Sequence, residues 1–163
     1  MQKLFHRRRN ANKKSVAIRM SFFKIGVSTM SEEIPQYNKA LELPGLAVRV
    51  EALEYHPELP AEADRPFPFV YFIRIVNDSQ HTVTFRARKW VVTDKHGDRI
   101  VVEGEGIVGK KPTLRPGEEF EYNSYHIIGT DSVATGSYHG VDDRGRHVFV
   151  RIPPFKLTVP ADE

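Results

Sequence analysis

The 163-residue sequence contains no cysteine. Without cysteine the chain can form no disulfide bond, no thiolate metal site and no thiol nucleophile. This composition agrees with a reducing compartment, and we expect a cytoplasmic protein. Long apolar runs are also missing, because no stretch approaches the roughly 18–20 residues that a membrane-spanning helix needs. We therefore expect no membrane association.

Acidic residues are absent from the first 30 positions, which carry eight lysine or arginine side chains. The rest of the chain therefore holds 16 basic and 21 acidic side chains, a net charge of −5. The overall net charge of +3 comes from the N-terminal segment. Clustered basic charge is typical of a tail, so the total charge does not predict a nucleic-acid-binding domain.

We predict a basic, disordered tail and linker over residues 1–44 and a folded domain over residues 45–160. Arg19 and Lys24 interrupt the only apolar patch of the tail, which excludes a secretory signal. Three interpretations remain open. The tail could be an unstructured leader or an upstream extension of the reading frame, since Met30 resembles an ordinary start. It could be an organellar targeting segment, which its composition fits, or an arm that contacts polyanions.

Short strands separated by turns account for the body of the chain. Apolar and polar residues alternate along residues 46–53, 119–128 and 147–152, as in half-buried strands. Residues 67–76 are apolar on both faces except at Arg74, which predicts a central strand. We expect Pro153 and Pro154 to break the last strand before an edge strand follows. The pattern predicts an all-β fold, an immunoglobulin/fibronectin III-like β-sandwich of about seven to eight antiparallel strands.

One predicted strand, residues 82–93, changes phase in its middle. Val83 and Phe85 place apolar side chains at odd positions, whereas Trp90 and Val92 place them at even positions. A slip of one residue would turn half of the strand inside out. The sequence therefore predicts a β-bulge or a crossing between sheets here.

A glycine-rich stretch contains a GxGxxG pattern and an overlapping GxxxxGK pattern. Dinucleotide-binding and P-loop motifs both need a helix after the loop, and Pro112 and Pro116 exclude one. The hydroxyl that holds Mg²⁺ in a P-loop is replaced by Lys111. Two interpretations remain: the glycines allow a bend between strands, or the loop binds pyrophosphate or phosphate. The candidate anion-binding residues are Gly104, Gly106, Gly109, Lys110 and Lys111.

No group of residues in the sequence converges on a catalytic or metal site. His126 and His139 fall on predicted strands and could approach each other across a sheet, but no histidine pair has metal-ligand spacing. Ser124, His126 and Asp131 supply the residue types of a catalytic triad without the turn that presents its serine. We therefore predict no catalytic residues, no metal site and no cofactor, and a protein that is not an enzyme.

Four spaced motifs resemble the ApaG family. They occur in order within residues 46–157 and are Arg88–Asp94, Val102–Gly109, Pro112–Tyr122 and Ile152–Leu157. Two segments depart from the pattern. Residues 122–125 read Tyr-Asn-Ser-Tyr where the family usually has Tyr-Thr-Ser-Gly, and residues 133–136 replace a G-x-M-x-G element.

The resemblance implies a fibronectin III-like sandwich without an established enzymatic activity. The ApaG family has been linked to cobalt resistance and magnesium efflux. The same domain occurs in F-box proteins and in a DNA-polymerase-interacting protein, where it looks like a protein-binding module. Its glycine motif has also prompted a proposal of pyrophosphate binding. We therefore expect a protein partner, with binding of a small anion, pyrophosphate or a nucleotide phosphate, as the alternative.

Overall fold

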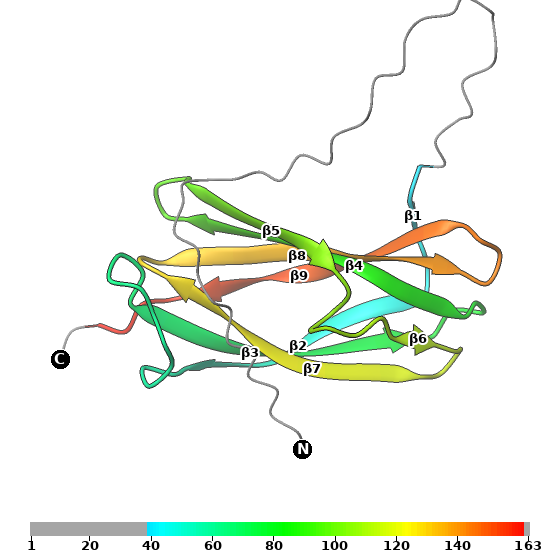
Figure 1. Cartoon of the computed structure of the whole chain (residues 1–163), viewed down its shortest axis with the longest axis horizontal. Coiled ribbons are helices and arrows are strands. Elements are labelled where there is room, and N and C mark those ends of the chain that lie inside the picture. Colours follow the sequence, from blue (N-terminus) through cyan, green and yellow to red (C-terminus); the bar gives the residue numbers. More distant parts are fainter. Residues whose placement is uncertain (1–38, 162–163) are drawn as a thin grey trace, which may run out of the picture.

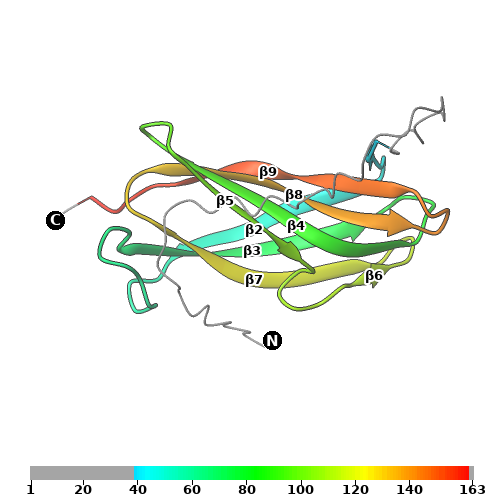
Figure 2. The same cartoon turned by 45° about the horizontal axis from the view of Figure 1, so that its top comes forward.

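The computed structural model describes residues 39–161, which form two stacked β-sheets (Figures 1 and 2). None of these residues is helical, so the described part of the chain offers no helix that could cross a membrane. The strands are β1 (Leu41–Glu42), β2 (Leu46–Tyr55), β3 (Phe67–Asn77), β4 (Val83–Asp94), β5 (Arg99–Glu105), β6 (Thr113–Leu114), β7 (Glu119–Ile128), β8 (Ser132–Asp142) and β9 (His147–Leu157).

The smaller sheet has the strand order β2-β3-β7, with β3 at its centre as the sequence predicts. The larger sheet has the order β1-β9-β8-β4-β5, and β6 pairs with one end of β4. Only the short pair between β1 and β9 is parallel among the described strands. The predicted all-β sandwich is confirmed. The described residues form more strands than predicted. The strands that the sequence did not predict are β1 and β6, which have only two residues each.

The phase change in β4 is a bulge. The register between β4 and β8 shifts between Phe85 and Ala87, and the two strands remain paired on both sides of the shift. Val83 and Phe85 before the bulge and Trp90 after it are therefore all buried. A bulge re-aims the alternating side chains so that both halves of one strand face the same interior.

Trp90 packs against side chains of both sheets. Its ring centroid lies 4.9 Å from that of Tyr71 on β3 and 4.8 Å from that of His126 on β7. Phe155 on β9 lies 5.9 Å away and closes the cluster. Aromatic pairs at such separations add to the stabilisation from buried area.

The prediction that Pro153 and Pro154 break the last strand is wrong, because β9 runs from His147 to Leu157 as one strand. The prolines instead lie at an irregularity of its ladder with β8, where the register shifts between Ile152 and Phe155. The short β1 pairs only with Val148 and Phe149, so the prolines lie where β9 has no neighbour on its outer side. Strands tolerate proline on an open side and at bulges, and the pair Pro153–Pro154 uses both, since neighbouring residues point their N–H groups to opposite sides.

The sandwich begins a few residues before the predicted boundary at residue 45. Leu41 and Glu42 pair with β9, and the side chain of Leu43 is part of the hydrophobic core. The Leu43 N–H also donates to the Phe149 carbonyl (3.3 Å), so burial and hydrogen bonding together hold this segment against the sheet. The remaining tail prediction, over residues 1–38, lies outside the described residues.

Candidate functional site

The glycine-rich stretch ends in a tight two-residue turn. The Ile107 N–H donates to the Lys110 carbonyl (2.7 Å), and the Lys110 N–H donates to the Ile107 carbonyl (3.0 Å). The two residues between them have positive φ, 50° at Val108 and 76° at Gly109, as in a type I′ turn. The Ile107 side chain is fully buried in the core. The loop is therefore a small hairpin whose Ile107 side chain anchors it in the core.

Arg88 holds the start of this loop. Its Nη1 donates to the carbonyl oxygens of Glu105 (2.8 Å) and Gly106 (3.0 Å). The Gly106 N–H in turn donates to the Arg86 carbonyl (2.6 Å). A Cβ added at Gly104 would lie 3.1 Å from Arg88 Nη1, so the missing side chain leaves room for the guanidinium. These glycines shape the bend and its arginine contact.

The five candidate anion-binding residues do lie together in this loop. The backbone N–H groups of Gly106, Ile107 and Lys110 already donate to carbonyl oxygens. Lys111 forms an ion pair with Glu105 (Nζ to Oε2, 3.2 Å), whereas Lys110 is exposed. An anion at this loop would therefore meet lysine side chains more than backbone amides.

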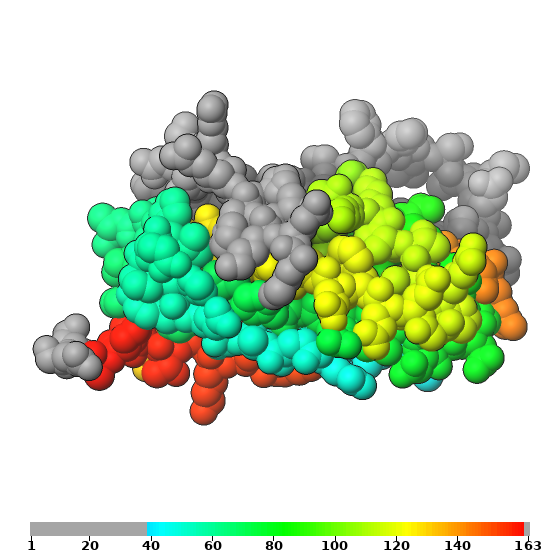
Figure 3. Space-filling model, turned by 90° about the horizontal axis from the view of Figure 1, so that it is seen from below, coloured from blue at the N-terminus to red at the C-terminus, as the bar shows by residue number. Residues whose placement is uncertain are grey.

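A groove of about 540 Å³ crosses the three-stranded sheet and reaches the glycine loop. Figure 3 views the molecule from the side of this sheet, with β2 in cyan and β7 in yellow. Ala52, Phe72 and Val108 are among the apolar residues of its lining, and Glu51 and Glu121 add carboxylates from the two flanking strands. The groove thus combines apolar surface with negative charge.

Arg74 lies among three glutamates in this groove. Its Nε is 2.9 Å from Glu51 Oε1, its Nη1 is 2.9 Å from Glu119 Oε2, and its Nη2 is 2.6 Å from Glu121 Oε1. Burial disfavours the charged guanidinium, but the three carboxylates outweigh this effect and raise the pKa of Arg74 above its ordinary value. The arginine holds the three carboxylates in place, and their negative charge exceeds its single positive charge.

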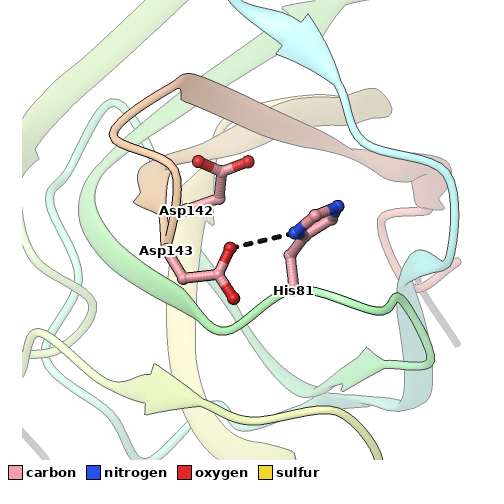
Figure 4. A group of neighbouring side chains, drawn as sticks. All are labelled: His81, Asp142 and Asp143. Carbon is pink, nitrogen blue, oxygen red and sulfur yellow. Dashed lines mark hydrogen bonds and ion pairs between the residues drawn. The ribbon is translucent and has the colours of Figure 1, made fainter.

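A second polar cluster joins the β3–β4 loop to the β8–β9 turn (Figure 4). His81 Nδ1 lies 2.9 Å from Asp143 Oδ1, and the Thr82 N–H donates to Asp143 Oδ2 (3.1 Å). His81, Asp142 and Asp143 bring their ligand atoms within 4.8 Å of one another, the one such group found among residues 39–161. In the sequence, a turn is enough to explain both aspartates. No pattern predicts that His81 lies close to them, because it is distant along the chain.

Asp142 is nevertheless committed to contacts within the protein. Its Oδ2 accepts a hydrogen bond from Arg146 Nε (2.7 Å), and its Oδ1 accepts from the backbone N–H groups of Arg144 and Arg146 (2.9 Å each). The Asp142 side chain is fully buried, with the turn wrapped around it. We call this cluster the clip: Asp142 stabilises the β8–β9 turn, and Asp143 links that turn to His81 and Thr82 of the β3–β4 loop.

This clip predicts an acid-sensitive stability. Burial alone would raise the pKa of Asp142, but hydrogen bonds from Arg146 and Arg144 outweigh it and lower that pKa. A carboxylate with a lowered folded-state pKa stabilises the fold above its ordinary pKa, and this contribution is lost as the pH falls through the folded-state value. We expect Asp142→Asn to reduce stability at neutral pH and to flatten its decline below about pH 5.

Urea denaturation of the wild type and Asp142→Asn across this pH range measures both effects. Asp64→Asn is a suitable control, because Asp64 is an exposed loop residue outside the clip. Equal stability of wild type and Asp142→Asn at every pH would contradict a stabilising role of Asp142 in the clip.

The other residues considered from sequence do not form a site. His126 faces the aromatic core from β7, whereas His139 lies on β8 in the other sheet, with its ring centroid 5.7 Å from that of Phe149. The expectation that the two histidines could approach each other is wrong, because they occupy different sheets and have different neighbours. Asp131 Oδ1 accepts a hydrogen bond from the Val159 N–H (2.8 Å), outside any triad arrangement.

Comparison with known proteins gives consistent matches over this domain. A family model described as the ApaG domain matches residues 57–142. The chain is 36% identical to protein ApaG of Sodalis glossinidius over 119 residues, covering 72% of this chain and 94% of the relative. It is 43% identical to protein ApaG of Rhodospirillum centenum over 108 residues, covering 66% and 83%. A crystal structure described as ApaA from Bordetella pertussis matches with a TM-score of 0.64 and 33% identity, covering 75% and 99%.

Proposed function

Because this chain belongs to the ApaG domain family, we propose that it is a non-catalytic binding module whose partner is a protein. The observation that carries this proposal is the groove on the three-stranded sheet. A concave surface that combines apolar side chains with ordered charges suits the recognition of another polypeptide.

The chemistry of the groove favours a partner segment with basic side chains around an apolar one. Phe72 offers an apolar contact surface on the central strand, and Glu51, Glu54 and Glu121 surround it with carboxylates. Arg74 and Lys110 also line the groove, so the three carboxylates exceed the cations there by one charge. Complementary charge steers such a partner to the groove, and the apolar contact supplies the affinity.

The family's link to cobalt and magnesium homeostasis would then act through the protein partner. His81, Asp142 and Asp143 are residue types that could bind a metal ion. Their carboxylates, however, already accept hydrogen bonds from Arg146 and from backbone N–H groups. A metal ion would have to displace these contacts before it could bind.

A second candidate function is anion binding at the glycine loop, favoured by Lys110, which is exposed and lines the groove. Calorimetric titration with pyrophosphate tests it, beside a variant with Lys110→Ala and Lys111→Ala. Heat of binding that disappears in the variant would support this function. Absence of binding in the wild type would leave protein recognition as the proposed function.

Binding of short peptides by the full chain tests the principal proposal. The probes carry lysine or arginine residues on both sides of one large apolar residue. We expect the combined substitutions Glu51→Gln, Glu54→Gln and Glu121→Gln to weaken binding about tenfold, which corresponds to about 1.4 kcal/mol. Glutamine keeps the shape of each side chain and removes its charge.

Asp64→Asn serves here too as a control that removes one exposed carboxylate away from the groove. We expect it to bind the peptides as the wild type does. Equal affinity of the wild type and the triple variant would contradict binding at the groove.

A further inference from the structure

The strand β5 forms one edge of the six-stranded sheet and pairs only with β4 among the described strands (Figure 2). It carries exposed apolar side chains: Val101 is 51% exposed and Ile100 is 39% exposed. No proline or bulge interrupts its ladder with β4. An unprotected edge of this kind is a template for pairing with another strand.

The hydrogen-bond pattern shows which backbone groups of β5 point outward. At the β4–β5 turn the Asp94 N–H donates to the Asp98 carbonyl (2.9 Å). In an antiparallel ladder, residues that bond to the neighbouring strand alternate with residues that do not. Even-numbered residues of β5 therefore bond to β4. Arg99, Val101 and Glu103 turn their N–H and C=O groups toward the open edge.

We propose that β5 pairs antiparallel with β5 of a second copy of this chain, with the two Val101 residues opposite each other. Arg99 then faces the partner's Glu103, and Ile100 faces the partner's Val102. The sequence from residue 99 to 103 is Arg-Ile-Val-Val-Glu, so every position meets a complementary one. The two Val101 residues then form a hydrogen-bonded pair, because the N–H and C=O groups of each point toward the other strand.

The outer face of the sheet supports the same register. Lys89 Nζ lies 2.8 Å from Glu103 Oε1, so Glu103 would stand between Lys89 and the partner's Arg99. Val91 is the neighbour of Val101 across the β4–β5 ladder. Pairing would therefore extend one row of valines across both copies. Cross-strand pairs of opposite charge and of β-branched residues are those that stabilise sheets.

Charge complementarity selects a second copy as the occupant of this edge. The basic and acidic ends of the five-residue segment match only when an identical segment runs in the opposite direction. The edge lies on the six-stranded sheet, whereas the groove lies on the other sheet. Self-association through β5 is therefore independent of the protein recognition proposed above.

Sedimentation equilibrium of the full chain over a range of concentrations tests this pairing. We expect a reversible dimer for the wild type. Arg99→Glu and Glu103→Arg should each weaken the dimer at least about tenfold, because each turns both interchain ion pairs into like-charge pairs. An equimolar mixture of the two variants should restore association, since every pair is then again opposite in charge.

Val101→Pro tests the backbone contribution separately. It removes an outward N–H without removing a bond to β4, so circular dichroism should show a folded protein and sedimentation a monomer. Arg49→Glu on the outer face of β2 is a control charge reversal that should leave the dimer intact. If Val101→Pro does not fold, the charge variants decide the matter. A wild type that is monomeric at every concentration, or a mixture of charge variants that stays monomeric, overturns the proposal.

Discussion

Trp90→Ala is expected to lower the free energy of unfolding by about 3–5 kcal/mol. Trp90 is only 2% exposed, and its ring contacts side chains of both sheets, including Tyr71 and Phe155. Alanine would remove the largest buried side chain and leave a cavity between the sheets that the surrounding strands can only partly close. Equilibrium denaturation in urea measures the change.

Val133→Ala provides the control for this substitution. Val133 is 37% exposed, so its loss should change stability within about 0.5 kcal/mol. Trp90→Phe should fall between the two, because it keeps an aromatic ring in the cluster. A loss below about 1 kcal/mol for Trp90→Ala would contradict the role of Trp90 as the tie between the sheets.

Ile107→Ala is expected to cost about 2–4 kcal/mol. Ile107 is fully buried and is the side chain by which the glycine-rich turn enters the core. If the glycine loop serves mainly to bend the chain and seat this isoleucine, the cost should resemble that of other core truncations. The same denaturation experiment measures it.

Val108→Gly is the matched control in the same loop. Val108 has φ of 50°, a conformation that a β-branched residue adopts only at a cost. Glycine loses packing and gains freedom in the unfolded state, but it relieves this strain. We expect a net change within about 1 kcal/mol. If Val108→Gly lowers the free energy of unfolding more than Ile107→Ala does, the turn conformation at Val108, and not the buried Ile107 side chain, holds the loop in place.

Local pattern was enough to predict the sandwich and the bulge in β4. The change of phase between Phe85 and Trp90 is visible in the sequence because both halves of the strand must face one interior. The proline pair in β9 misled the prediction, since its effect depends on whether a neighbour needs the missing N–H. On one side of β9, the strand β1 is more than 100 residues away and stops short of the prolines, and on the other side the ladder with β8 shifts its register around them.

The groove could not be predicted because its parts come from separate strands. Arg74 appeared in the sequence as the one charged residue of a central strand, and its three glutamate partners lie on β2 and β7. The turn at Val108 and Gly109 could not be predicted for another reason. Valine rarely adopts positive φ, so its presence does not indicate a turn of this type. In contrast, Pro112 and Pro116 correctly excluded a helix after the loop.

Protein recognition at the groove is tested most directly by nuclear magnetic resonance of the isotope-labelled full chain, titrated with a basic peptide that carries one large apolar residue. The proposed function predicts amide shift changes centred on Phe72, Glu121 and Asn123, which line the groove. These changes should saturate with the peptide, and the triple glutamine variant should need about tenfold more peptide to reach the same changes. No shift changes, or changes confined to residues away from the three-stranded sheet, would contradict it.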